Sequence, residues 1–258
     1  SALHDSFVKC YSHYRKDDQY LIFTEFCSKG NLKEEILRRK KPKRPWSESE
    51  IVGVCEKLFE AMARLHEHNI IHGDLKPDNL FVTEDDQIKI GDFGSGFCLR
   101  SEMQAEGVRG TLNYMPPEML QAYYSKKLIT QQDWKKVDVW CMGRVICEMA
   151  TLKHWDASNA LELSGKVKQY LEKKCYDANF IELITRMHSA SPNNRPSFVE
   201  ALSEIRSIKC LVRDYNFAIS NLELDPGLDC LSECSQCILG SLGSTACASV
   251  LSAFWAPW

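Results

Sequence analysis

Residues 70–81, with the sequence IIHGDLKPDNLF, limit what this chain can fold into more than any other segment. The apolar residues at both ends predict two short strands, and residues 87–90 predict a third strand that leads into Asp92, Phe93 and Gly94. Between the first two strands the chain carries a carboxylate, an ammonium and an amide, and Asp92 adds a second carboxylate. Groups of these kinds can hold a divalent cation beside a phosphate. The segment therefore indicates a site that handles phosphate groups.

Five motifs resemble, in the same order, those of the eukaryotic protein kinases. The pattern H-x-D-x-K-x-x-N from His72 is similar to the kinase catalytic loop, and D-F-G from Asp92 to the metal-binding loop. Three further motifs resemble the end of the activation segment, the start of the central helix and a late helix junction: residues 110–118, 138–143 and 194–196. The resemblance covers roughly residues 4–212 and implies an α+β, protein-kinase-like fold.

This resemblance divides the chain into three parts. Residues 1–27 are expected to be a two-stranded remnant of the small N-terminal lobe with the hinge, and residues 28–212 the helical C-terminal lobe. Residues 213–258 would form an extension that is uncharged at its end. Residues 7–11 and 20–26 are rich in β-branched and aromatic side chains and predict a hairpin with an unpaired edge. Apolar residues at helical spacing predict helices near residues 32–39, 51–65 behind the capping box Ser47-x-x-Glu50, 137–149, 180–187 and 198–208.

The kinase resemblance also implies roles for the polar residues. Asp74 would accept or orient the proton of the substrate hydroxyl, and Lys76 would neutralise charge on the transferred phosphate. Thr111 would bond both of them, as its counterpart does in the serine/threonine branch. Asn79 and Asp92 would hold Mg²⁺, which bridges the phosphates of ATP. Taken singly, each residue has the alternative of a purely structural loop residue, and the combined spacing favours the site.

For the nucleotide base, the resemblance implies a flat apolar slot. Phe81 would lie under the adenine, and Thr24 would be the gatekeeper at the back of the pocket. The backbone of Glu25 and Cys27 would bond the edge of the purine. A slot with few polar contacts is what such a ligand requires.

The implied function is a serine/threonine protein kinase that transfers the γ-phosphate of ATP to hydroxyls of a protein substrate. The sequence contains neither a glycine-rich loop nor the strand lysine that pairs with a helix glutamate in this family. We therefore expect weak ATP binding and poor catalysis from this chain by itself, as a kinase domain truncated at its N-terminus. The alternative is a catalytically silent, pseudokinase-like binding module. The hinge and residues 150–154 faintly resemble Nek-like kinases.

A second departure is Gly73, where many kinases carry an arginine that binds a phosphorylated activation segment. A glycine cannot form that charge-assisted contact. The resemblance then implies that this segment needs no phosphorylation, although Ser95 and Ser101 remain available. Glu118 and Arg195 are expected to form the buried ion pair that holds the segment to the large lobe.

Residues 38–44, with the sequence RRKKPKR, form the single dense charge cluster of the chain. Their place between two helices favours a solvated loop, and the alternatives are a nuclear import signal or a surface for acidic protein substrates. The net charge of −3 argues against nucleic acid as a partner. The 12 scattered cysteines and the lack of a secretory signal predict an intracellular, cytoplasmic protein with reduced thiols, or a nuclear one through this cluster.

The end of the chain gives weaker signals. Residues 237–258 are long enough to span a bilayer, but their glycines and serines and the lack of flanking basic residues disfavour contact with a membrane. A zinc site is a further alternative, with spacings that fit no familiar pattern, formed by Cys230, Cys234, Cys237 and Cys247.

Overall fold

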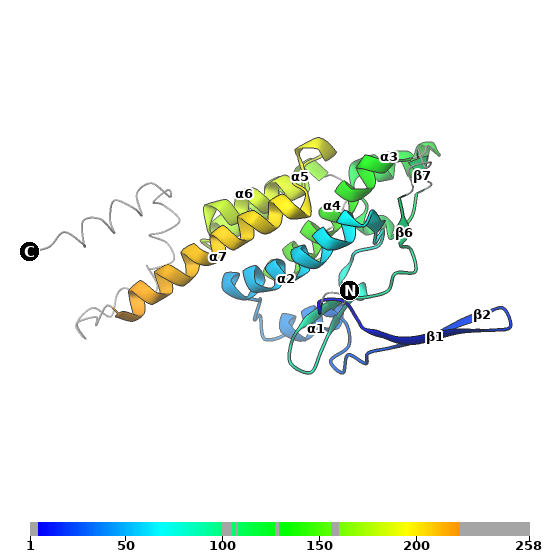
Figure 1. Ribbon diagram of the computed structural model, residues 1–258. Helices are drawn as coiled ribbons and strands as arrows, with labels where there is room; N and C mark the ends of the chain where they lie inside the picture. The colour runs from blue at the N-terminus through cyan, green and yellow to red at the C-terminus, as the bar shows by residue number, and fades with distance from the viewer. Residues whose placement is uncertain (1–4, 100–104, 107, 127–128, 156–159, 222–258) are drawn as a thin grey trace, which may run out of the picture.

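The structure, a computed structural model, describes residues 5–99, 105–106, 108–126, 129–155 and 160–221. It has the α+β character that the sequence predicts, with short strand pairs beside a larger helical body (Figure 1). Its elements are β1 (Cys10–Lys16), β2 (Gln19–Thr24), α1 (Leu32–Lys40), α2 (Glu48–Glu67), β3 (Ile70–Ile71), the 3₁₀ turn η1 (Pro77–Asn79), β4 (Leu80–Val82), β5 (Ile88–Ile90), β6 (Phe97–Cys98), β7 (Ala105–Glu106), η2 (Leu112–Tyr114), α3 (Pro117–Ser125), β8 (Ile129–Thr130), α4 (Gln131–Thr151), α5 (Ala160–Lys173), α6 (Ala178–Met187), η3 (Pro192–Asn194) and α7 (Phe198–Asn221).

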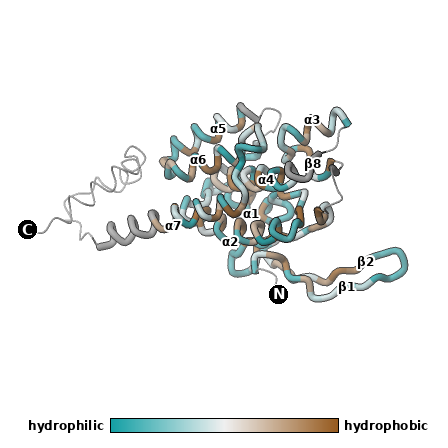
Figure 2. Tube along the Cα trace, turned by 45° about the horizontal axis from the view of Figure 1, so that its top comes forward, coloured by the Kyte–Doolittle hydropathy of each residue, from teal (hydrophilic) through white to brown (hydrophobic). Residues whose placement is uncertain are grey.

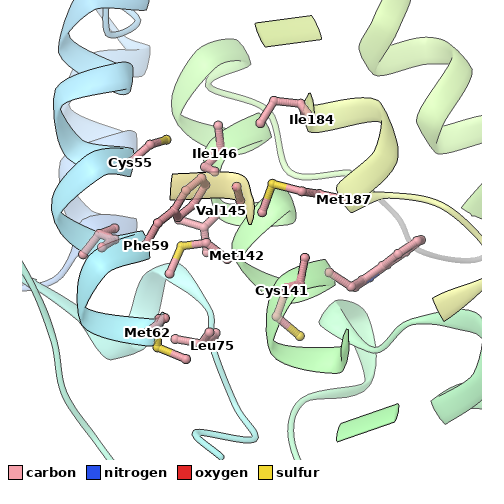
Figure 3. Close-up of a cluster of buried hydrophobic side chains, with 14 of the residues drawn as sticks. Cys55, Phe59, Met62, Leu75, Cys141, Met142, Val145, Ile146, Ile184 and Met187 are labelled. Carbon is pink, nitrogen blue, oxygen red and sulfur yellow. The ribbon is translucent and has the colours of Figure 1, made fainter. Parts of the chain in front are cut away.

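The hydrophobic core lies where α2, α4 and α6 meet, and α7 packs along α2. Helix α4 is buried around most of its circumference, and Trp134 and Trp140 expose no surface. Figure 3 shows Phe59 of α2, Ile146 of α4 and Met187 of α6 in one cluster. A helix that is buried on most of its sides lies at the centre of such a body. The predicted helices are therefore present, and α4 is the one on which the others pack.

Two helices begin at reciprocal capping pairs, of which the Ser47–Glu50 pair is the one that the sequence predicts. The side chain of Asn31 accepts a hydrogen bond from the backbone of Glu34 at the start of α1, and Glu34 bonds back to Asn31. The same reciprocal pair forms between Ser47 and Glu50 at the start of α2. Each pair satisfies backbone N–H groups that have no partner inside the helix.

The hairpin β1–β2 extends away from the body and pairs with no other strand among the described residues (Figures 1 and 2). This agrees with the expected unpaired edge, and Tyr11 and Ile22 are both more than 60% exposed. The bounds expected for the first strand, residues 7–11, are wrong, because β1 runs from Cys10 to Lys16. Phe7 is buried and bridges Ile90 instead, so the strand starts at Cys10.

The strands near the centre of the chain position the polar loops. β3 pairs with β6, and β4 pairs with β5 in an antiparallel hairpin whose partners are Leu80 with Ile90 and Val82 with Ile88. The loop between β3 and β4 carries the first polar motif, and Asp92 follows β5. The start of β4 and the end of β5 lie side by side in this hairpin. The loop before β4 and the loop after β5 are therefore neighbours.

The structure bears only in part on the predictions about the thiols, a membrane span and the end of the chain. Every cysteine among the described residues is a free thiol. No helix in that part of the chain is long and apolar enough to cross a bilayer. The uncharged end of the chain and its four cysteines lie outside the described residues.

Glu48 joins the start of α2 to the start of α6. Its Oε1 accepts a hydrogen bond from the backbone N–H of Asp177 at 2.9 Å. The carboxylate of Asp177 in turn caps α6 by accepting from the N–H groups of Asn179 and Phe180. Burial raises the pKa of Glu48 from 4.5 to about 7, although the bond from Asp177 opposes the shift.

This raised pKa makes stability depend on pH. The folded state binds more protons than the unfolded chain between pH 4.5 and about 7, so the contribution of Glu48 is full below pH 4.5 and lost as pH rises to about 7. The amide oxygen of Glu48→Gln can still accept from Asp177. We expect this variant to raise the free energy of unfolding by about 1–3 kcal/mol above neutral pH, with a gain that shrinks toward pH 4.5.

Chemical denaturation across this pH range measures the effect. The matched control is Glu67→Gln, which makes the same change in an exposed residue at the other end of α2. It should alter the free energy of unfolding by less than about 0.5 kcal/mol, as surface substitutions usually do. A constant gain at every pH in Glu48→Gln would mean that titration of Glu48 is not the cause.

Candidate functional site

Asp74 lies at the centre of a hydrogen-bonded cluster in the loop between β3 and β4. Its Oδ2 accepts from Nζ of Lys76 at 2.7 Å and from Nδ2 of Asn79 at 3.1 Å. Its Oδ1 accepts from the hydroxyl of Thr111 at 2.7 Å. Nζ of Lys76 also donates to the Thr111 hydroxyl at 2.7 Å, which closes the ring of contacts. The structure thus brings three of the predicted site residues together around the carboxylate of a fourth, Asp74.

The shape of this loop depends on Asp138, a fully buried carboxylate in α4. It accepts from the backbone N–H groups of His72 and Gly73 at 3.0 Å each, and its Oδ2 lies 2.9 Å from Nε2 of His66. A buried carboxylate needs such donors, and here they are the backbone of the loop itself. Sequence analysis placed Asp138 only in the central helix and missed this positioning role. The signal for it was a carboxylate inside an otherwise apolar segment.

His72 connects the Asp74 loop to the segment that carries Asp92. Its Nε2 donates to the carbonyl of Gly91 at 3.0 Å, and its Nδ1 accepts from the backbone N–H of Asp74 at 3.3 Å. Its ring packs against Phe93 with centroids 4.9 Å apart. One buried side chain therefore fixes both loops relative to each other.

Two glycines allow the backbone segments around Asp74 to approach closely. Gly73 has φ +76°, and a Cβ there would lie 3.0 Å from the carbonyl oxygen of Ser95. Gly110 has φ +97°, and a Cβ there would lie 2.5 Å from the carbonyl oxygen of Gly73. Local geometry therefore favours glycine at Gly73 and requires it at Gly110. The link between Gly73 and phosphorylation of the activation segment stays a prediction.

We expect Gly110→Ala to pull Thr111 away from Asp74. The new Cβ meets backbone at 2.5 Å and disfavours the left-handed conformation, so the segment has to shift. A displacement of about 1 Å near reacting groups costs up to about a hundredfold in rate. Steady-state assay of phosphate transfer measures this loss, and Gly165→Ala is the control because a Cβ there meets nothing within 4 Å. Full activity in Gly110→Ala would contradict the role given to the Thr111 contact.

Asn79 and Asp92 fit the requirements of a magnesium site. Nδ2 of Asn79 is used by Asp74, which leaves its amide oxygen for a cation, and the backbone N–H of Gly91 donates to the carbonyl of Asn79 at 3.0 Å. Asp92 has φ +55° and uses Oδ1 to accept from Gly94, so Oδ2 can serve as a ligand. Among the described residues, no group of three or more His, Cys, Asp or Glu side chains could hold a metal. Mg²⁺ suits such a sparse set, because it binds through one or two protein oxygens plus phosphates and water.

The residues expected at the adenine lie along β4 and at the end of β2. Phe81 is in β4, and its ring is so close to Gly91 that a Cβ there would lie 2.8 Å from it. Cys27 is buried. The carboxylate of Glu25 accepts from Nζ of Lys89 at 2.6 and 2.7 Å, and this hydrogen bond lowers its pKa. Thr24 is the last residue of β2 and is exposed, and its place at the back of the nucleotide pocket stays a prediction.

The segment after Thr111 is attached to the helical body by two buried acidic contacts. Glu118 and Arg195 form the expected ion pair, with both guanidinium N–H groups donating to the carboxylate at 2.6 and 2.8 Å. The hydroxyl of Tyr114 donates to Glu148 of α4 at 3.0 Å. Burial raises the pKa of Glu148, and it raises that of Tyr114 as well. Through these contacts the segment that carries Thr111 is attached to α4 by Glu148 and to the residue that follows η3 by Arg195.

Comparison with known proteins gives consistent results. The model of the protein kinase domain family matches residues 1–205. The chain is 33% identical over 218 residues to serine/threonine-protein kinase Nek9 of Mus musculus, a match that covers 82% of this chain and 21% of that protein. It is 32% identical over 207 residues to Nek9 of Xenopus laevis, covering 77% and 21%, and 35% identical over 188 residues to Nek4 of Mus musculus, covering 70% and 22%. The chain spans about a fifth of the length of these relatives.

Proposed function

Because this chain belongs to the protein kinase family, with a Nek-like serine/threonine kinase domain, we propose that its Asp74 cluster transfers the γ-phosphoryl group of ATP to serine and threonine hydroxyls of proteins. The family match confirms the expected kinase-like fold, and the relatives confirm the resemblance to Nek-like kinases. The observation that carries the proposal is the single cluster in which Lys76, Asn79 and Thr111 all contact Asp74.

In the proposed reaction, the carboxylate of Asp74 receives the proton of the acceptor hydroxyl. The oxygen of that hydroxyl forms a bond to the γ-phosphorus, and the bond from this phosphorus to the β–γ bridging oxygen breaks. Lys76, held between Asp74 and Thr111, places its ammonium where negative charge moves through the transition state. The hydrogen bond from Thr111 keeps Oδ1 of Asp74 in a fixed direction. Positioning of this kind supplies most of the catalysis in phosphoryl transfer.

Asn79 and Asp92 would hold Mg²⁺, which supplies neutralisation of the nucleotide phosphates when bound. Phe81, Glu25, Cys27 and Thr24 would line the nucleotide base in this proposal. Its support is the position of Phe81 beside Gly91, directly before Asp92. Substitution of Asp92 by Asn removes a charged ligand and leaves the fold of the hairpin in place.

The test is transfer of label from γ-labelled ATP with Mg²⁺ to a generic protein substrate, followed by phosphoamino acid analysis. The assay uses the longest natural form of the protein, since the relatives are about four times as long as this chain. Phosphoserine and phosphothreonine are the expected products. ATP and Mg²⁺ should also raise the melting temperature, because a ligand stabilises the state that binds it. A shift in melting temperature with no transfer would identify a silent nucleotide-binding module and contradict the proposal.

A further inference from the structure

A pocket of about 280 Å³ lies between α1, α2, the β4–β5 hairpin and Lys209 of α7, and it is built from residues other than those of the Asp74 cluster. The ring of Trp46 and the aliphatic side chains of Val54, Val82 and Ile88 supply apolar wall. Gly53 leaves the α2 side of the pocket open, since a Cβ there would meet nothing within 4 Å. The pocket can therefore accept an apolar side chain.

The acidic groups that line this pocket are already engaged within the chain. Glu35 accepts from Arg38 at 2.9 Å and from Arg39 at 2.7 Å. Asp86 pairs with Lys29 at 2.7 Å. The carboxylate of Glu50 accepts both the backbone and the hydroxyl donor of Ser47 in the α2 capping box. Glu50 also interacts electrostatically with Arg39 and with Arg44. Negative charge in the pocket wall is thus locally compensated by cations of the chain.

The loop beside the pocket, in contrast, carries positive charges that form no ion pair among the described residues. Arg39 and Trp46 both line the pocket, and the residues between them form the loop that connects these two positions. We call this segment, residues 40–45, the basic lip. It carries four exposed cations for which the described residues supply no ion pair: Lys40, Lys41, Lys43 and Arg44. Glu50 of the pocket wall offsets part of the charge of Arg44. The three lysines leave the lip with surplus positive charge.

The basic lip is also held in one shape. The backbone N–H of Lys43 donates to the carbonyl of Lys40 at 3.2 Å, and that of Arg44 donates to the carbonyl of Arg39 at 3.0 Å. The guanidinium of Arg39 stacks 4.0 Å from the centre of the Trp46 ring. A loop closed by these contacts loses little conformational freedom when it binds a ligand. The backbone that carries its cations is therefore prearranged.

We propose that this surface docks an acidic linear peptide of a partner protein, whose apolar side chain enters the pocket and whose Asp or Glu residues contact the basic lip. Charge complementarity selects the acidic residues, and the pocket selects an apolar anchor among them. A nucleic acid has phosphates for the lip but no side chain for the pocket, and the protein's net charge is −3. The docking surface would recruit partners independently of phosphoryl transfer, and it gives the basic cluster noted in the sequence a specific occupant.

Fluorescence polarisation with the 258-residue chain tests the proposal. The probes are a panel of labelled short peptides that place one leucine, phenylalanine or tryptophan at varied positions within a run of glutamates, at about 0.15 M salt. At least one should bind with a Kd of about 10–100 μM. Its versions with glutamine for glutamate, or with serine for the apolar residue, should bind at least about tenfold more weakly.

Variants of the protein assign the binding to this surface. Lys41→Glu with Lys43→Glu should weaken binding at least about tenfold by reversing charge on the lip. The control Lys173→Glu with Lys174→Glu makes the same charge change on exposed residues at the end of α5 and should change Kd by less than about twofold.

Gly53→Leu adds a side chain at the pocket wall, where the new Cβ meets nothing within 4 Å, and should also weaken binding at least about tenfold. Its control is Gly165→Leu, another open helical position. The proposal is overturned if no peptide of the panel binds, if Gly53→Leu binds as the unmodified chain does, or if a single-stranded oligothymidine binds as tightly with the same dependence on the lip. None of these readouts requires catalytic activity, so they separate this proposal from the proposed kinase function.

Discussion

We expect Asp74→Asn to lower the turnover of phosphate transfer by about 10²–10⁴-fold. The substitution removes the group that receives the substrate proton, but it preserves the size of the side chain. The carbonyl oxygen of the new amide can still accept from Lys76 or Thr111, so the loop should keep its shape. The loss should therefore appear in kcat, and the melting temperature should move by no more than a few degrees.

The matched control for this experiment is Asp78→Asn, which makes the same change in the same loop. Asp78 pairs with Lys33 of α1 at 2.8 Å, a partly exposed contact of about 0–1 kcal/mol. Its loss should alter kcat by less than about threefold, because this carboxylate does not contact Lys76 or Thr111. If Asp74→Asn kept turnover within about tenfold of the unmodified protein, Asp74 would not be the proton acceptor. If both variants fell equally, the effect would belong to the charge of the loop as a whole.

The parts of this structure that the sequence predicts best depend on short separations along the chain. The capping box of Ser47 and Glu50 spans three residues, and α2 begins there. The contacts of Asp74 with Lys76 and Asn79 are similarly local, since they lie within one loop and its 3₁₀ turn. Spacing in the sequence becomes distance in space when the chain between two residues has few conformations. For this reason the motif H-x-D-x-K-x-x-N, which the kinase resemblance marks as a site, also predicts that its polar residues lie close together.

Contacts between distant segments were predictable where the kinase resemblance supplied them, as it did for Glu118 with Arg195. Asp138 bonds the backbone of His72 across 66 positions, and its place in an apolar segment indicates a buried carboxylate without naming its partner. The first strand was misplaced for a related reason, because Phe7 is drawn into the body by its bridge to Ile90. An alternating segment predicts a strand but does not say where another part of the chain will capture one of its residues. The pocket beside Trp46 also arises only when two helices and a hairpin meet.

A second large effect is expected for Arg195→Ala, a loss of about 3–5 kcal/mol in the free energy of unfolding. Arg195 is 1% exposed and its guanidinium lies 4.9 Å from the centre of the Trp140 ring. Besides the two bonds to Glu118, it donates to the carbonyls of Ser189 and Lys136. The alanine variant leaves the Glu118 carboxylate without its cation and both carbonyls without this donor. The segment that carries Thr111 would then lose its anchor to the helical body.

Denaturant titration measures this loss, and a surface pair provides the control. Arg64→Ala removes an exposed i,i+4 contact with Glu60 and should cost less than about 1 kcal/mol. The paired variant Arg195→Met with Glu118→Leu separates the cost of a stranded charge from the worth of the ion pair. It should regain part of the loss, because neither charge is then buried alone. If Arg195→Ala melts at an unchanged temperature, Glu118 does not depend on Arg195, and the segment must be held mainly through Tyr114 and Glu148.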